Sequence, residues 1–204
     1  MDLIGGYDSP FVRRVAITLH LYGAPFTHRA LSTDDPALLH ISPLGRIPAL
    51  VLNGAEVLTD SSAIIDHLDG CHADRALTPP SGDARRAVLA LTALALAVGD
   101  KYVAAWYECT ARPESHRWQP WLDRLTGQVA QGLAALEDAL QGDFLHGNRM
   151  TQADVTAVAI LDAIRFDMPD LAPGGSYPNL TALSARLSAQ PAFAFTHPAA
   201  VRPA

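Results

Sequence analysis

Three short segments place polar groups where a helix or a strand is predicted to begin, and such places bind small anions and peptides. In the first segment, Ser9 directly precedes Pro10, and proline is favoured at the first helical position because an N–H there would have no partner. Helix N-termini carry a partial positive charge that favours a thiolate. The Ser9 hydroxyl could donate a hydrogen bond to a bound thiolate at about 3 Å, although the same serine also suits a plain helix cap.

The second segment is Ile47–Pro48, directly before a predicted strand at residues 49–52. A cis Ile47–Pro48 bond would turn the Ile47 backbone outward, so that its N–H and C=O could bond a peptide-like ligand as a neighbouring strand does. Most peptide bonds before proline are trans, however, and an ordinary turn is equally compatible with the sequence.

The third segment is Asp60–Ser61, where a predicted strand runs directly into a helix. The N–H groups of a helix N-terminus and a serine hydroxyl bind a carboxylate, while an adjacent aspartate can take an ammonium group. Together they suit the head of an α-amino acid. The alternative is simple capping, since Asp and Ser are both common at this position.

Two further local patterns carry no predicted chemistry. Thr151, followed by Asp154 at the start of an apolar helix, is a capping box that we interpret as a folding element. Cys71 and Cys109 are far apart and form no Cys-x-x-Cys motif, so we expect reduced thiols and no dithiol–disulfide exchange.

The elements that position these segments follow the order βαβαββα over residues 1–76, which predicts an α/β thioredoxin-like N-terminal domain. The first two strands should be parallel, and the last two should form an antiparallel hairpin across Asn53–Gly54. The expected strands are residues 3–4, 26–31, 49–52 and 57–59, and the expected helices are residues 10–22, 36–40 and 61–68.

The second half is predicted to be an all-α C-terminal domain over residues 83–204, after a linker at residues 77–83 that contains Pro79–Pro80. Long helices are expected over residues 84–108 and 118–140, from residue 151 onward, and around residues 180–187, while the tail after Pro191 is left unassigned. The second helix carries an apolar stripe of Trp121, Leu125, Val129, Leu133, Leu136 and Leu140.

Composition excludes several classes of protein. The formal net charge of −6 over 204 residues argues against sequence-independent nucleic-acid binding, and we interpret Arg13–Arg14 and Arg85–Arg86 as solvated helix positions. The N-terminus lacks the pattern of a signal peptide, and the apolar run at residues 87–98 is too short to span a membrane, so a cytoplasmic protein is expected. The histidines show no metal-ligand spacing, are interpreted as surface or capping residues, and predict no metal.

Taken in order, these segments resemble the glutathione transferase superfamily, most closely its serine-type bacterial, theta and zeta classes. Residues 9–15 look like the start of the family's first helix, and residues 43–50 like the loop before its cis-proline. Residues 60–65 resemble its Glu/Asp-Ser-x-Ala-Ile signature, and residues 151–154 resemble the N-capping box of its sixth helix. The resemblance covers essentially the whole chain.

The resemblance implies a glutathione site with a role for each matching residue. Ser9 would donate to the glutathione thiolate, with Tyr7 as its rival because other classes use a tyrosine near the end of the first strand. Ile47 would pair with the cysteinyl part, beside a cis Pro48. Asp60 and Ser61 would hold the γ-glutamyl head.

The resemblance also implies contacts with the glycyl end of glutathione and with the electrophile. Arg46, with His40, would meet the glycyl carboxylate. Tyr102, Trp106 and Tyr107 would line an apolar pocket for the electrophile, although core packing or a dimer contact is an equal alternative for each.

The implied function is that of a glutathione transferase involved in detoxification, which takes glutathione as co-substrate, reacts with a small hydrophobic electrophile and works as a homodimer. There are two alternatives. The first is a glutathione-dependent isomerase, dehalogenase or peroxidase, and the second is a non-catalytic glutathione-binding stress-response module.

Overall fold

The computed structural model describes residues 1–53 and 56–201 and divides the chain into two compact units. One unit holds Met1–Pro80 and the segment from Ser188 onward, and the other holds Ser81–Leu187. The break after Pro80 falls within the expected linker. The C-terminal segment, which we expected in the helical domain of residues 83–204, groups instead with the first unit.

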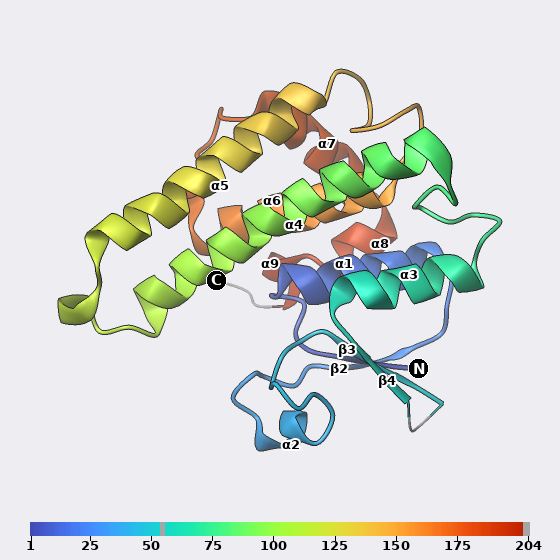
Figure 1. Cartoon of the computed structure of the whole chain (residues 1–204), viewed down its shortest axis with the longest axis horizontal. Coiled ribbons are helices and arrows are strands. Elements are labelled where there is room, and N and C mark those ends of the chain that lie inside the picture. Colours follow the sequence, from blue (N-terminus) through green and yellow to red (C-terminus); the bar gives the residue numbers. More distant parts are fainter. Residues whose placement is uncertain (54–55, 202–204) are drawn as a thin grey trace. The chain divides into compact units, whose positions relative to one another are not determined.

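The first unit has the expected order βαβαββα (Figure 1). Its elements are β1 (Asp2–Ile4), α1 (Pro10–Leu21), β2 (Thr27–Arg29), α2 (Pro36–Leu39), β3 (Ala49–Leu52), β4 (Glu56–Thr59) and α3 (Ser61–Cys71). The sheet order is β2-β1-β3-β4, with β1 and β2 parallel and the other two pairs antiparallel. The predicted antiparallel pairing of the last two strands is confirmed, whereas Gly54 of the predicted turn lies outside the described residues.

Helices cover both faces of this sheet. Figure 1 shows α1 and α3 side by side over one face and α2 over the other. On the α2 side, Leu38 packs with Ile4 of β1 and Ala49 of β3, and all three are fully buried. Ile47 is partly buried against this cluster, which ties the loop before β3 to the core.

Helix α1 begins and ends where the sequence predicts, yet its buried face is wider than expected. Ser9 is its N-cap, Pro10 is its first residue, and Gly23 follows its end with a φ of +60°. Arg13 and Arg14, interpreted above as solvated, are 0% and 1% exposed, so that prediction was wrong. The physical reason is tertiary, because the partners of both guanidinium groups come from distant parts of the chain.

One of these partners explains the grouping of the C-terminal segment. This segment forms α8 (Pro191–Ala194) and α9 (Pro198–Val201), and α8 packs on α1. Arg13 Nη2 donates to the C=O of Phe193 at 3.5 Å, and the Phe193 side chain is fully buried. The tail that the sequence left unassigned therefore completes the core of the first unit.

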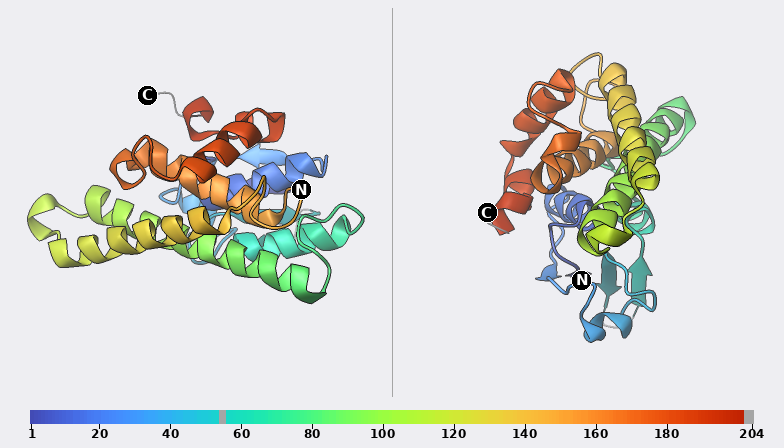
Figure 2. Two further views of the ribbon diagram at one scale, coloured as in Figure 1. Left: turned by 90° about the horizontal axis from the view of Figure 1, so that it is seen from above. Right: turned by 90° about the vertical axis from the view of Figure 1, so that its left-hand side faces the viewer.

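The second unit is helical, as predicted. Its elements are α4 (Gly82–Thr110), η1 (Glu114–His116), α5 (Gln119–Ala139), α6 (Gln152–Asp167), η2 (Pro169–Leu171) and α7 (Pro178–Ser188). Helix α4 packs against both α5 and α6, and α4 and α5 lie side by side in both views of Figure 2. The stripe on α5 is buried from Leu125 onward, but Trp121 is 40% exposed and does not belong to the core.

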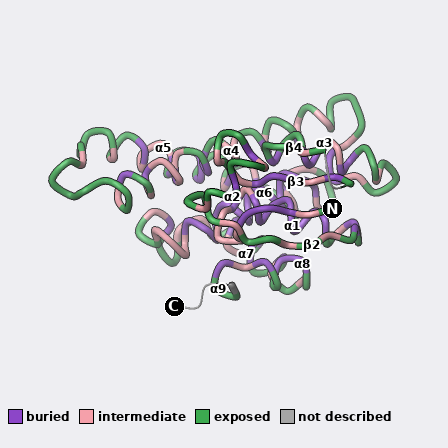
Figure 3. The backbone as a smooth tube through the Cα atoms, turned by 90° about the horizontal axis from the view of Figure 1, so that it is seen from below, coloured by how far each residue is buried: buried purple, intermediate pink, exposed green. Residues whose placement is uncertain are grey.

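Helix α6 is the buried centre of this unit. All its residues from Gln152 to Ile164 are buried. Much of the trace around the α6 label in Figure 3 has the purple colour of buried residues. The predicted capping box at its start is confirmed, because the Asp154 carboxylate accepts from both the N–H and the hydroxyl of Thr151. Asp154 also accepts from the N–H of Leu145 at 2.7 Å, which anchors the incoming loop.

Helix α4 is longer than its apolar centre indicates. It spans 29 residues and is, among the described residues, the one helix whose length and composition would allow a membrane crossing. The sequence argument that the apolar run at residues 87–98 is too short to span a membrane therefore does not hold, because the helix that contains this run is long enough. Its packing against α5 and α6 matches the alternative of a core helix in the second unit.

Candidate functional site

The sheet register gathers three of the predicted segments at one end of the first unit. Ile4 at the end of β1 pairs with Ala49 at the start of β3, which pairs in turn with Thr59 at the end of β4. The residues that follow β1, precede β3 and follow β4 therefore emerge side by side. These are the glycine turn that leads to Ser9, the Ile47–Pro48 pair and Asp60–Ser61.

Ser9 occupies the cap position of α1 and is partly exposed. Its Oγ accepts from the N–H of Val12 at 3.5 Å, which is at the long limit for a hydrogen bond. The cap interaction is therefore weak. Since a hydroxyl both donates and accepts, Ser9 keeps its proton to donate to another group.

Tyr7, the rival donor, is fixed by an aromatic stack. Its ring lies parallel to that of His28 with centroids 3.8 Å apart, and His28 Nε2 lies 2.7 Å from the C=O of Gly5. Because a carbonyl only accepts, that nitrogen carries the proton. Burial raises the pKa of the Tyr7 phenol, so Tyr7 remains a neutral donor at physiological pH. His28, interpreted above as a surface or capping residue, instead packs beside the candidate site.

The Ile47–Pro48 bond is cis, the geometry that the resemblance implies. Among the described residues, neither the N–H nor the C=O of Ile47 takes part in a backbone hydrogen bond, which leaves both for a ligand. Gly5 allows this loop to come close, because a Cβ at Gly5 would lie 2.8 Å from the Ile47 Cβ and 2.7 Å from the Val12 Cγ2. Its φ of +118° also favours glycine.

The start of α3 holds the Asp60–Ser61 pair. Asp60 is the N-cap with a φ of +69°, and its Oδ1 accepts from the N–H of Ser62 at 2.7 Å. A non-glycine residue at positive φ is uncommon and is a recurrent feature of functional sites. The Ser61 N–H is one of the first in the helix and, among the described residues, donates to no backbone carbonyl.

Ser61 itself is 4% exposed, and its Oγ has a partner that the sequence did not reveal. Arg14 Nη1 donates to it at 2.9 Å from α1. Burial lowers the pKa of Arg14 to about 10, although the negative charges of Asp60 and Asp69 oppose this change. Arg14 remains a cation at neutral pH and lies directly against the serine.

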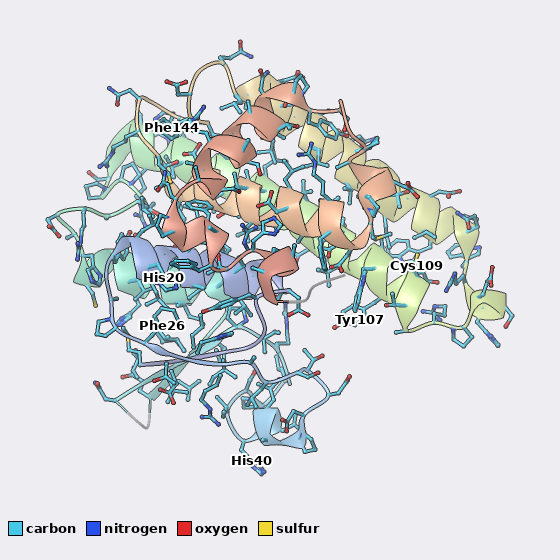
Figure 4. The ribbon with its side chains drawn as sticks, turned by 180° about the vertical axis from the view of Figure 1, so that it is seen from behind. His20, Phe26, His40, Tyr107, Cys109 and Phe144 are labelled. Carbon is cyan, nitrogen blue, oxygen red and sulfur yellow. The ribbon has the colours of Figure 1, made fainter. Side chains whose placement is uncertain are left out.

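Arg46 and His40, predicted to meet a carboxylate, are both exposed. Figure 4 shows His40 extending from the end of α2 at the edge of the molecule. The N–H of Arg46 donates to Ser42 Oγ at 3.2 Å, which fixes the backbone of the loop. Neither side chain has a hydrogen-bond partner of its own among the described residues.

The three aromatic residues predicted to line a pocket lie on α4 of the second unit and differ in exposure. Tyr102 is 2% exposed and its hydroxyl donates to Asp167, so it is a packing residue of the helical core. Trp106 and Tyr107 contact each other edge to face with centroids 5.0 Å apart, and Tyr107 is 45% exposed (Figure 4). Of the three predicted residues, Trp106 and Tyr107 are the two that are not fully buried in the helical core.

No group of three or more potential metal ligands occurs within residues 1–53 and 56–201. The described site offers the hydroxyl groups of Ser9 and Ser61, the N-terminal ends of α1 and α3 and the open backbone groups of Ile47.

Comparison with known proteins identifies the family. Residues 3–76 match the family model "Glutathione S-transferase, N-terminal domain", and residues 98–191 match "Glutathione S-transferase, C-terminal domain". The chain belongs to the glutathione transferase superfamily.

Solved structures of relatives agree over nearly the whole chain. A glutathione S-transferase from Methylobacterium radiotolerans, in complex with glutathione sulfonate, is 32% identical with a TM-score of 0.91, over 97% of this chain and 94% of that one. A family member from Pseudomonas fluorescens Pf-5 with bound glutathione is 33% identical with a TM-score of 0.88, over 97% and 98%.

Another relative has a more specific activity in its name. The maleylacetoacetate isomerase of Rhizobium meliloti is 33% identical over 93% of this chain and 92% of its own length. The fold, the family and the enzyme class predicted from the sequence are thus confirmed, while the roles of individual residues stay predictions.

Proposed function

We propose that the first unit binds glutathione at the end of the sheet where Ser9, Ile47 and Ser61 emerge, and that the enzyme reacts the bound thiolate with a small hydrophobic electrophile. The observation that supports this proposal is the register of Ile4, Ala49 and Thr59, which brings the three segments predicted to bind a ligand to one end of the sheet. The glutathione bound to the Pseudomonas fluorescens relative supports the identity of the ligand.

Each part of glutathione has a proposed partner. The γ-glutamyl carboxylate takes the N–H and hydroxyl of Ser61, and its ammonium group takes Asp60, whose Oδ1 is already used by the Ser62 N–H. The cysteinyl backbone pairs with the N–H and C=O of Ile47. Arg46 and His40 are exposed cations or donors within the proposed reach of the glycyl carboxylate.

Ser9 and the N-terminus of α1 stabilise the thiolate. A charge-assisted hydrogen bond and a helix end together are worth about 1.4–3 kcal/mol, which lowers a thiol pKa by about one or two units. A larger fraction of bound glutathione is then ionised at neutral pH, and the thiolate rather than the thiol is the nucleophile.

A glutathione-dependent isomerase is the second candidate, because the Rhizobium meliloti relative is a maleylacetoacetate isomerase. The same thiolate would serve that reaction, and only the electrophile would differ. Trp106 and Tyr107 are the proposed contributors of apolar surface to the electrophile. The predicted role of Tyr102 is not part of this proposal, because its side chain is buried in the helical core. We further propose a cytoplasmic homodimer with a role in detoxification.

Calorimetric titration with reduced glutathione tests the binding site. We expect binding with a Kd between about 1 μM and 1 mM, weakened about tenfold or more by Ser61→Ala through loss of a hydrogen bond to a charged group. Ser62→Ala is the matched control, because Ser62 is the exposed next residue of the same helix and is expected to bind normally. Absence of binding at about 10 mM glutathione would contradict the proposal.

A further inference from the structure

Arg14 is a buried cation with an unusual location for a charged residue. It is 1% exposed on α1, and it meets α3 from 47 residues away through the 2.9 Å bond from Nη1 to Ser61 Oγ. Burial of an arginine is costly unless its charge and its donors find partners, so its presence calls for a specific role.

The direction of this hydrogen bond determines what Ser61 can offer a ligand. A guanidinium group only donates, so the Ser61 oxygen must accept from Arg14. The serine hydroxyl also has one proton to donate, and that proton is not the one in the Arg14 bond. A ligand that approaches Ser61 therefore meets a hydrogen-bond donor, which suits a carboxylate.

The positive charge of Arg14 also favours binding of a carboxylate at Ser61. The guanidinium lies against the first residue of α3, where the N-terminal end of the helix already carries a partial positive charge. Asp60 and Asp69 contribute opposing negative charge. Arg14 is therefore a fixed cation behind Ser61 that favours a carboxylate. The neighbouring Asp60 is an acidic group that favours the ammonium group of the same amino-acid head.

We propose that Arg14 is a positioning residue for the γ-glutamyl carboxylate of glutathione: it holds Ser61 as a donor and supplies positive charge behind it. This inference rests on the proposed function of the site. It adds to that function the residue that makes binding selective for glutathione over an analogue without the γ-glutamyl carboxylate.

The test compares two ligands on the same set of variants. One ligand is glutathione, and the other is its analogue with 4-aminobutyrate in place of the glutamyl residue, which lacks only that carboxylate. Arg14→Met removes the charge and the donors while keeping a long side chain. Arg86→Met makes the same change at an arginine that is 74% exposed, and is the matched control.

We expect Arg14→Met to weaken glutathione about tenfold or more, while the analogue changes less than about threefold and Arg86→Met changes neither. The turnover number at saturating glutathione should stay close to that of the unaltered enzyme, because Arg14 acts on binding. In a Ser61→Ala background, Arg14→Met should weaken glutathione clearly less than it does alone, because the two residues act as one unit.

Equal weakening of both ligands, or of neither, would overturn the inference while leaving glutathione binding by the unaltered protein intact. Absence of glutathione binding by the unaltered protein would instead overturn the proposed function and this inference together. If Arg14→Met does not fold, Arg14→Gln removes the charge, keeps an N–H donor for Ser61 and allows the same ligand comparison: selective weakening of glutathione supports the role, and equal weakening or none overturns it.

Discussion

Replacement of Ser9 by alanine separates a structural role from a catalytic one. The cap bond from the Val12 N–H is 3.5 Å long, so its loss should cost at the low end of the range for N-caps, about 0.5 kcal/mol. Pro10 at the first helical position and the buried face of α1 are unaffected. We therefore expect the Ser9→Ala protein to fold with nearly unchanged stability.

The effect on the bound thiol should be much larger. If the Ser9 hydroxyl donates to the thiolate, its removal raises the pKa of bound glutathione by about one unit, which corresponds to about 1.4 kcal/mol. The helix end remains and keeps part of the effect. Since activity rises as the thiol ionises, the pH profile of kcat/KM for the electrophile, measured at saturating glutathione, should shift upward by the same amount.

The assay is a pH titration of the thiolate absorbance of enzyme-bound glutathione, paired with thermal unfolding of each variant. Ser9→Thr keeps the hydroxyl and should retain the low pKa. Tyr7→Phe should leave the pKa of the bound thiol unchanged, because Ser9 rather than Tyr7 donates to the thiolate in this account. The phenylalanine ring can keep the stack on His28, so the local structure should stay the same.

Two results would refute this reasoning. An unchanged thiol pKa in Ser9→Ala would show that Ser9 is only a cap. A raised thiol pKa in Tyr7→Phe, with Ser9→Ala normal, would assign the thiolate to the rival tyrosine.

Three further predictions concern the scaffold. Tyr22→Phe should lower the free energy of unfolding by about 1–3 kcal/mol in urea denaturation, because the buried Asp69 carboxylate and a backbone N–H lose their shared hydroxyl partner; unchanged stability would contradict this. Gly132→Ala should cost about 1–3 kcal/mol, since its Cβ would collide with the stiff Val98 side chain, and a neutral result would mean that α5 shifts freely. Asp154→Ala should lower the melting temperature by several degrees, because three donors lose their acceptor, and an intact melting temperature would remove the capping box from the account.

The elements of the first unit were predictable because their signals are local. Pro10 and Gly23 bound α1, and the apolar run that forms β3 is followed by a turn residue, Asn53, at a φ of +47°. Each of these signals depends on backbone preferences within a few residues. For the same reason the capping box at Thr151 was predicted from four residues alone.

The burial of Arg13 and Arg14 was not predictable in this way. Their pattern on the helix is the same as that of solvated arginines, and the groups that bury them, Phe193 and Ser61, lie 180 and 47 residues away. A local reading of charge has no access to such partners. The C-terminal segment is missed for the same reason, since its short helices are stabilised by packing on α1 rather than by their own sequence.

The candidate site itself was predictable only in part. The sequence indicated three candidate segments for ligand binding, because Ser9, Pro48 and Asp60 each mark the start of an element, and the sheet register brings these segments to one end of the first unit. It did not indicate the supporting residues: His28 holds Tyr7 through a ring stack, and Gly5 makes room for the loop before β3. Such support depends on side chains that meet across the sheet.

A crystal structure of the protein with glutathione would test the central claim most directly. The account predicts the γ-glutamyl carboxylate on Ser61, the cysteinyl backbone paired with Ile47, and the sulfur within about 3.5 Å of the Ser9 Oγ. Glutathione bound away from this end of the sheet, or with its sulfur on Tyr7 rather than on Ser9, would contradict it.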